Sequence, residues 1–314
     1  MSKTQLCSNL EFTVGSKVFL LGEYLILKNK PALLASLLPK FKMSFAVSDV
    51  NKNTIDQSPI ELLKNKTQVQ DSYQFIDPFK GSGGFGASTA EFALYYYYLL
   101  KNRPDLNLSS DWQSVYRLYR SLFFGKKVKP SGADLVVQWH GGAVVFDPEN
   151  LTVKDMTEKL KWDQLLVFQS THQEGRKVAT HKHLEKLSNL TWFNDESDWV
   201  NSLDEIYNRS IIALENNKDA QFGEMLTCYG DALFNLGLED ENIQLEKIEL
   251  KKIPGVLGIK GLGAMQSDGL LLFLDQETAH QKNGNLEKIL TKANELDLKP
   301  ISNRGYPEKG IGVL

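Results

Sequence analysis

The sequence predicts an α+β protein of two domains, with strands and helices in separate runs of the chain. Three observations support this fold class. The 314 residues and 42% hydrophobic content allow two full cores. Short strand-like runs dominate the start of the chain, whereas long helical stretches occupy much of its second half. The sequence changes from mostly short strand-like runs to mostly long helical stretches between residues 151 and 161. We therefore divide the chain into domains 1–155 and 156–314.

The first elements are short apolar runs. Residues 16–21 (SKVFLL) and 24–27 (YLIL) are strand-like, and Gly22-Glu23 between them indicates a turn or bulge. Residues 31–38 (PALLASLL) fit a strand or a helix equally well. Residues 41–50 alternate apolar and polar side chains, which predicts a half-buried strand.

A polar stretch separates this strand from a glycine-rich loop. Residues 51–68 are expected to form a surface excursion, and residues 71–77 a returning strand. Apolar side chains recur at helical spacing after Ser88, which with Thr89 offers hydroxyl caps for that helix. Its tyrosines are interpreted as core residues. A second helix follows from Trp112 and closes at Gly125.

The second half begins with a strand over residues 162–171 that ends in a polar loop. Two long helices are predicted over residues 198–216 and 220–237. Residues 255–274 then give a strand, a glycine loop and another strand.

Composition narrows the function classes. The net charge is −3 with no basic tail, so no nucleic-acid partner is expected. No apolar run approaches the ~20 residues that cross a bilayer, and the start lacks the pattern of a signal peptide. Cys7 and Cys228 form no ligand or disulfide pattern, which indicates a reduced cytoplasmic location. The oligomeric state stays open, a homodimer being one option.

The loop FKGSGGFGASTA contains the letters G-x-G-x-x-G, but no apolar strand precedes it directly and no suitable acidic residue follows, as a dinucleotide fold requires. A P-loop would need lysine where Ala87 stands. Glycines still let backbone N–H groups approach an anion at a helix start. The residues expected to bind phosphate are Gly81, Gly83, Gly84, Gly86, Ala87, Ser88 and Thr89.

Three further segments accompany this loop: VGSKVFLLGEYLILKNKPALLASL, KPSGADLVVQWHGG and GIKGLGAMQSDGLLLF. In order and spacing, the four resemble the signature segments of the GHMP kinases over most of the chain. GSKVFLLGEY is the most specific, being close to the family pattern P-G-K-x-x-x-x-G-E-[HY]. The resemblance implies an N-terminal mixed-sheet α/β domain that holds ATP, a C-terminal ferredoxin-like α+β domain, and an active site between them.

The resemblance also implies roles. Asp134 matches the aspartate assigned as catalytic base, and Lys17 matches a lysine beside it on the phosphoryl path. Ser88 matches a serine that contacts Mg²⁺ or phosphate. Phe123 stands where mevalonate kinases carry a Mg²⁺-binding glutamate, so this ligand is missing.

The implied acceptor site draws on three segments. Glu23 either contacts substrate or anchors its turn, and the third glycine loop departs from the family at Met265 and Gln266. Thr171, Arg176 and Lys177 follow a strand and either meet an anionic substrate or are simply solvated. The residues implied to bind substrate are Glu23, Tyr24, Ser131, Gly132, Thr171, Lys260, Gly263, Ala264 and Asp268.

The resemblance therefore implies an ATP- and Mg²⁺-dependent kinase of the mevalonate route to isoprenoids. Tyr24 and Asp268 resemble phosphomevalonate kinases, whereas PSGAD resembles mevalonate kinases; phosphomevalonate is slightly favoured as acceptor. Two alternatives stay open. An NAD-dependent oxidoreductase would rest on the glycines alone, and a catalytically silent ATP-binding relative is suggested by Phe123. His181 and His183, two apart on an expected helix with no cysteine nearby, do not predict a zinc site.

Overall fold

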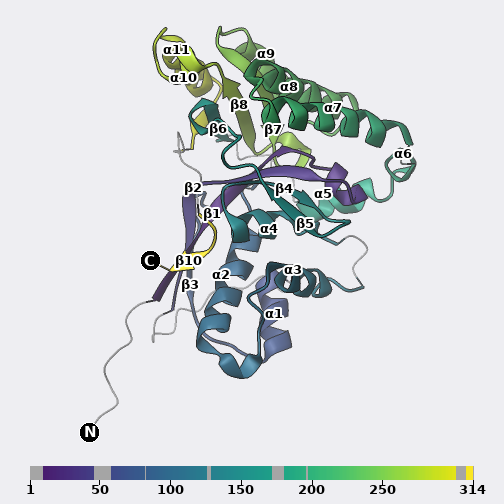
Figure 1. The fold of residues 1–314 in the computed structure, drawn as a ribbon, viewed down its shortest axis with the longest axis vertical. Coiled ribbons are helices and arrows are strands. Elements are labelled where there is room, and N and C mark those ends of the chain that lie inside the picture. Colours follow the sequence, from purple (N-terminus) through teal and green to yellow (C-terminus); the bar gives the residue numbers. More distant parts are fainter. Residues whose placement is uncertain are drawn as a thin grey trace.

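The computed structural model describes residues 10–45, 58–81, 83–125, 129–171, 180–195, 197–301 and 309–313. Two antiparallel sheets lie one beyond the other along the long axis, each accompanied by helices (Figure 1). The mixed α+β class is as predicted. None of the described helices is both long and apolar enough to cross a membrane.

The first sheet has the strand order β10-β1-β2-β4-β5, with β3 paired to β2. Its strands are β1 (Leu10–Leu21), β2 (Ala32–Phe45), β3 (Gln74–Ile76), β4 (Ala143–Asp147), β5 (Thr152–Asp155) and β10 (Gly312–Val313). The helices of this part are α1 (Pro59–Thr67), α2 (Ala87–Asn102), α3 (Trp112–Ser121) and α4 (Ala133–His140), with short 3-10 turns η1 (Leu25–Lys28) and η2 (Pro104–Leu106).

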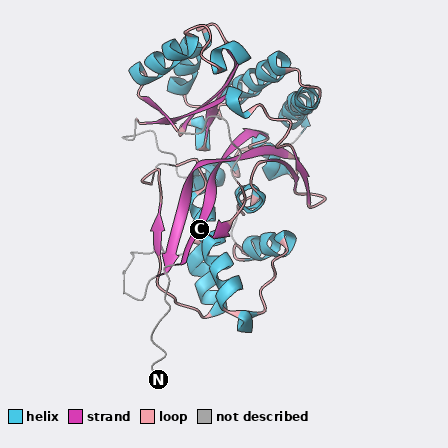
Figure 2. Ribbon diagram, turned by 60° about the vertical axis from the view of Figure 1, so that its left-hand side comes forward, coloured by secondary structure: helices cyan, strands magenta, loops and turns pink. Residues whose placement is uncertain are grey.

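The second sheet has the order β7-β8-β6-β9. Its strands are β6 (Leu165–Ser170), β7 (Val256–Leu262), β8 (Gly269–Leu274) and β9 (Leu298–Pro300). Helices gather beyond it, at the top of Figure 2. These are α7 (Ser197–Glu215), α8 (Asp219–Asn235), α9 (Glu241–Lys251), α10 (Gln276–Ala279) and α11 (Asn285–Glu295). The same half of the chain also contains α5 (Thr180–Leu187), α6 (Thr191–Asn194) and the 3-10 turns η3 (Trp162–Gln164) and η4 (Ala264–Gln266), and α5 lies closer to the first sheet (Figure 1).

The interpretation of YLIL as strand-like is wrong, because the chain leaves β1 and forms η1. Tyr24 and Asn29 have φ values of 69° and 59°, and left-handed residues on both sides end the extended path. Gly22 makes this turn possible: a Cβ on it would lie 2.5 Å from Ala32 Cα. The ambiguous PALLASLL segment belongs to β2, which continues into the predicted alternating strand.

The surface excursion predicted over residues 51–68 contains helix α1 within its described part. Ser58 caps it by accepting a hydrogen bond from the Glu61 N–H at 3.3 Å. Ile60 and Leu63 are buried, so this largely polar helix contributes to the core.

Helix α2 begins as predicted but is capped differently. Gly86 is its N-cap residue, and Ser88 is exposed. Thr89 donates its hydroxyl back to the Gly86 carbonyl at 2.9 Å. Tyr95 and Tyr96 are fully buried, in agreement with their interpretation as core residues. Helix α3 stops at Ser121, ahead of the predicted end.

The end of the chain returns to the first sheet. Phe12 of β1 pairs with Val313 of β10. Before this return, the chain leaves the first sheet at the end of β5 and enters the second sheet with β6. The predicted domain boundary between residues 155 and 156 falls in the connection from β5 to β6 and stays a prediction. Dividing the chain only there does not account for β10, which comes from the end of the chain and pairs with β1 of the first sheet.

Candidate active site

An ion pair joins β1 to the start of α4. Lys17 Nζ lies 3.1 Å from Asp134 Oδ1, with side-chain exposures of 9% and 27%. The two residues predicted as catalytic are thus in contact, although they are far apart in the sequence. A partly buried pair is held more firmly than a surface pair, because solvent screens it less.

The glycine loop lies directly beneath Lys17. The Lys17 N–H donates to the Phe85 carbonyl at 3.1 Å, which ties β1 to the loop. A Cβ on Gly86 would lie 2.8 Å from Lys17 Cγ and 2.9 Å from Gln138 Nε2, so only glycine fits. Gln138 on α4 donates its amide to the Gly15 carbonyl at 3.3 Å and to the Gly86 carbonyl at 3.1 Å. Sequence reasoning missed this buried glutamine.

Two helices begin beside the ion pair. Gly86 is the N-cap residue of α2, and Gly132 that of α4. Helix N-termini carry partial positive charge and free N–H groups, so together with Lys17 they favour an anion. The turn before α4 is fixed by Arg120, which donates to the Ser131 carbonyl at 3.1 Å, and by Ser131 Oγ, which accepts from the Ala133 N–H at 3.3 Å. Ser131 and Gly132 therefore shape the site.

The beginning of the glycine loop is organised by Asp77, a residue that the sequence reasoning did not select. Its two carboxylate oxygens accept from the N–H groups of Phe79 and Gly81, each at 2.8 Å. Such an aspartate turn is readable in the sequence as D-P-F-K-G. Two hydroxyl groups were predicted to contact phosphate. That of Ser88 is exposed at the start of α2, whereas that of Thr89 donates a hydrogen bond to the Gly86 carbonyl.

The third glycine loop meets the first one. The carboxylate of Asp268, between η4 and β8, lies against the backbone of Gly83 and Gly84. A Cβ on Gly83 would lie 2.8 Å from Asp268 Oδ1, and one on Gly84 would lie 2.7 Å from Oδ2. Gly263 also approaches this carboxylate too closely to carry a side chain, and Ala264 follows it as a buried residue of η4. Segments from both halves of the chain therefore share one site.

Glu23 and Lys260, both among the predicted substrate-binding residues, contact each other. Lys260 Nζ contacts Glu23 Oε1, and Gln266 donates its amide to the same oxygen at 2.8 Å. The Lys260 side chain is 0% exposed and that of Glu23 12%. Burial lowers the pKa of Lys260, against the opposing effect of the Glu23 carboxylate. Lys260 and Gln266 thus hold the Glu23 carboxylate beside its turn, and substrate contact by Glu23 or Lys260 stays a prediction.

Tyr24, a predicted substrate-binding residue, contacts His183 of α5. Its hydroxyl is 3.1 Å from His183 Nε2. Burial, together with nearby carboxylates that include Glu23 and Asp268, raises the Tyr24 pKa. Burial also lowers the His183 pKa, which favours the neutral ring. Thr171 donates its hydroxyl to the Asp297 carbonyl at 2.7 Å.

Two of the predicted contacts, Arg176 and Lys177, lie outside the described residues. Phe123, at the position of the missing glutamate, packs its ring edge-on against Tyr119 with centroids 5.4 Å apart. Among the described residues no group of three or more His, Cys, Asp or Glu forms a ready metal site. Oxygen ligands of the kind that Mg²⁺ prefers lie around the glycine loop, among them the Ser88 hydroxyl and the carboxylates of Asp77, Asp134 and Asp268.

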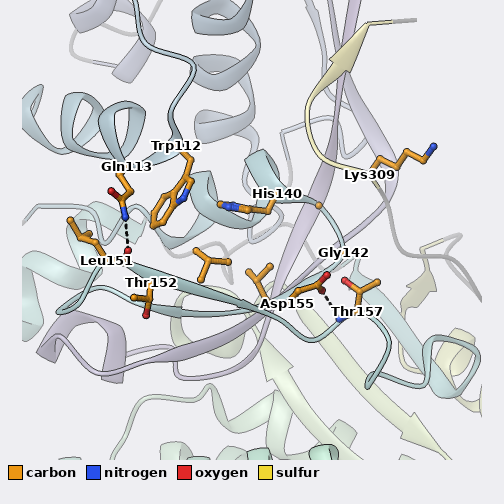
Figure 3. Close-up of a pocket in the computed structure, with 12 residues that line it drawn as sticks. Trp112, Gln113, His140, Gly142, Leu151, Thr152, Asp155, Thr157 and Lys309 are labelled. Atoms are coloured by element: carbon orange, nitrogen blue, oxygen red, sulfur yellow. Dashed lines mark hydrogen bonds between the residues drawn. The ribbon is translucent and has the colours of Figure 1, made fainter.

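A pocket of about 570 Å³ lies at the other end of α4 and contains none of the predicted site residues. Figure 3 shows Trp112 and His140 beside each other on its wall, with Lys309 extending away. Their rings meet edge to face with centroids 5.3 Å apart. Asp134 and His140 are six residues apart on α4, or about 9 Å along the helix axis. The pocket is therefore separate from the ion pair.

No family model and no curated protein matches this sequence. Solved structures match over almost its full length. The Listeria innocua Lin0012 protein has a TM-score of 0.72 at 13% identity, covering 98% of this chain and 99% of that one. Streptococcus pneumoniae phosphomevalonate kinase gives 0.69 at 17% identity, covering 96% and 99%. The L. major mevalonate kinase in complex with R-mevalonate gives 0.63 at 16% identity, covering 96% and 95%.

These similarities establish the fold. The kinases among the matches, which also include a Lactococcus lactis galactokinase at a TM-score of 0.69, are GHMP kinases. The resemblance read from the four sequence segments is confirmed at the level of the fold.

Proposed function

We propose that this chain, which has the fold of the GHMP kinases, is an ATP-dependent phosphotransferase acting on a small molecule. One observation supports this most strongly: the Lys17–Asp134 ion pair, 3.1 Å long, lies directly above the glycine loop and beside the starts of α2 and α4. A base, a cation and free helix N–H groups are the parts that phosphoryl transfer requires in one place.

Each part has a task. Asp134 accepts the proton of the acceptor oxygen as the new O–P bond forms and the bond to ADP breaks. Lys17 holds the Asp134 side chain in position and adds positive charge where the transferred phosphoryl group carries negative charge. The N–H groups at the start of α2 bind and orient phosphate. Mg²⁺, when bound with Ser88 among its contacts, would supply further charge neutralisation.

The acceptor is proposed from the sequence segments and the matched structures. One similar structure is a phosphomevalonate kinase and another a mevalonate kinase, at comparable identity. Tyr24 and Asp268 favour phosphomevalonate slightly, and mevalonate is the second choice. Residues 1–155 would hold ATP, and residues 156–314, as a ferredoxin-like layer, would cover it. The pathway is then that of the isoprenoid precursors.

The oxidoreductase alternative loses its structural basis. A dinucleotide fold places its glycine loop between a parallel strand and a helix. Every strand pair between named strands of the described part of the chain is antiparallel, including β2 with β3 ahead of the glycine loop. The other alternative, a relative that binds ATP without catalysis, is distinguished from a kinase by activity measurements, because it would bind ATP but release no ADP with any acceptor.

An ADP-release assay tests the proposal. Mevalonate, phosphomevalonate, homoserine and several sugars are offered with ATP and Mg²⁺, and ADP release above the acceptor-free rate is expected with one of the first two. Asp134→Asn should lower turnover about 100- to 10,000-fold, the effect of losing a positioned base, with little change in ATP affinity. Asp275→Asn is the matched control, because Asp275 caps α10 at the far end of β8 and asparagine caps equally well. Unaltered turnover in Asp134→Asn would refute the assigned role.

A further inference from the structure

We propose that Gln138 is a positioning residue for phosphoryl transfer. Its buried amide fixes the spacing between helix α4, which carries Asp134, and the segments that carry Lys17 and the start of α2. The inference deepens the proposed function and rests on it, because it assigns a part in the same reaction to a residue that acts only through its neighbours.

Gln138 lies on the face of α4 that carries Asp134. The two residues are four apart on this helix, so their side chains leave it on the same side, one turn apart. Asp134 meets Lys17 of β1 there, and Gln138 meets the backbone of β1 and of the glycine loop. Gln138 is 0% exposed. Water therefore does not compete for the hydrogen bonds of its side chain.

The amide of Gln138 joins three elements. Its Nε2 donates to the Gly15 carbonyl of β1 at 3.3 Å and to the Gly86 carbonyl at the start of α2 at 3.1 Å. The pairing of β1 with β2 shifts register just after Gly15, and the residues of β2 that this shift skips include Pro39, which has no N–H to donate. The amide thus supplies a donor to β1 where the partner strand is irregular.

The start of α2 has other anchors besides this amide. The Gly86 carbonyl also accepts from the Ala90 N–H and from the Thr89 hydroxyl, each at 2.9 Å. The N–H groups proposed to bind phosphate would therefore stay in place without Gln138. What the amide adds is a link of fixed length from α4 to the start of α2 and to β1.

Stability alone does not explain a glutamine at this position. Its Oε1 is buried and accepts no hydrogen bond from the described residues. A buried oxygen without a donor costs free energy that an apolar side chain of similar length would avoid. We therefore assign the two Nε2 bonds to the alignment of Asp134 with Lys17. If α4 shifts along β1, Asp134 moves relative to the phosphate site, and a misplacement of about 1 Å can lower a rate about 100-fold.

Turnover and calorimetric ADP binding, measured on the same preparations, test this inference. Gln138→Met keeps the length of the side chain and removes both donors, whereas Gln138→Asn keeps the amide and shortens its reach. Turnover is measured with ATP, Mg²⁺ and whichever of mevalonate and phosphomevalonate the wild type uses faster. For both variants we expect kcat to fall about 10- to 100-fold. The Kd of ADP with Mg²⁺ should stay near the wild-type value, because the start of α2 keeps its other bonds.

The matched control is Gln113→Met. Gln113 of α3 likewise donates its amide to a backbone carbonyl, that of Leu151 at 2.9 Å, in the pocket at the other end of α4 (Figure 3). This substitution removes the same kind of hydrogen bond away from the ion pair, and kcat should stay at the wild-type value. Thermal unfolding of each variant shows whether it is folded at the assay temperature.

The outcomes separate the two proposals. Folded Gln138 variants with the kcat of the wild type, or with kcat and ADP affinity lowered in parallel, would overturn the positioning role and leave the kinase proposal intact. Failure of both variants to fold would assign Gln138 to the fold alone and would also overturn that role. A folded wild-type chain that releases ADP with no acceptor offered would overturn the proposed function and this inference together.

Discussion

Replacing Gly86 by alanine tests whether the glycine loop supports the ion pair. Gly86 has φ +86°, and its added Cβ would lie 2.8 Å from Lys17 Cγ and 2.9 Å from Gln138 Nε2. Both distances are shorter than a carbon atom can tolerate, so the side chains of Lys17 and Gln138 would have to move away from the new methyl group. Because Lys17 holds Asp134 and Gln138 holds the loop, the substitution disturbs both.

The magnitude follows from two contributions. A non-glycine residue in the left-handed region costs about 1–2 kcal/mol. Overpacking against well-fixed neighbours costs about 1–3 kcal/mol more. Gly86→Ala should therefore lower the free energy of unfolding by about 2–5 kcal/mol. Gly81→Ala is the matched control, because Gly81 has φ +82° but nothing within 4 Å of its added Cβ. It should lose only the conformational part, about 1–2 kcal/mol.

Equilibrium urea unfolding measures both free energies under identical conditions. The account predicts that Gly86→Ala is the less stable variant by about 1–3 kcal/mol, the overpacking part alone. Equal losses would show that Lys17 and Gln138 do not press on Gly86, and the geometry of the loop would have to be revised. Turnover should also fall further in Gly86→Ala than in Gly81→Ala when both are assayed well below their unfolding transitions.

Three further predictions concern other parts of the site. Ser88→Ala should raise the Mg²⁺ concentration needed for half-maximal activity, and a superimposable magnesium titration would count against a Ser88 contact. Lys260→Met should destabilise the fold by about 3–5 kcal/mol in chemical unfolding, because it leaves the Glu23 carboxylate buried without its cation; a loss below about 1 kcal/mol, typical of an exposed pair, would argue that this pair is solvated. The lowered pKa of His183 means that the unfolded chain takes up its proton more readily, so stability should fall as the pH drops below the ordinary histidine value of 6.5. His183→Gln should flatten that part of the stability–pH curve, and an unchanged slope would contradict the assignment.

The sequence located the segments of the site because their chemistry is local. Gly86 and Gly132 both have positive φ and open a helix, and such turns leave a glycine in the sequence that can be recognised without the fold. The resemblance of the surrounding letters then identified Lys17 and Asp134, which the structure places in contact. Their catalytic roles stay proposals.

Side-chain contacts between residues far apart in the sequence could not be predicted from the sequence. Glu23 and Lys260 are 237 residues apart in sequence, and the sequence analysis did not predict that they contact each other. Tyr24 and His183, 159 residues apart, form a hydrogen bond that no periodic pattern indicates. A single sequence specifies periodicity along an element, but not which buried charge meets which.

Two elements were predicted wrongly for reasons that lie in the local sequence. The four apolar residues of YLIL are too few to distinguish a strand from a 3-10 turn, and the left-handed Tyr24 that decides between them is not a glycine. Helix α1 was overlooked because most of its residues are polar. Its Ser58-Pro59 start, with Glu61 three residues after the serine, was nevertheless a usable capping signal.

The central claim is that phosphate transfer takes place where Lys17 and Asp134 meet the glycine loop. A crystal structure of the chain with Mg²⁺ and a non-hydrolysable ATP analogue tests it most directly. The account predicts the γ-phosphate beside Lys17 Nζ, with the other phosphates against the start of α2. A nucleotide seated in the pocket of Trp112 and His140 instead, or anywhere remote from Lys17, would contradict it.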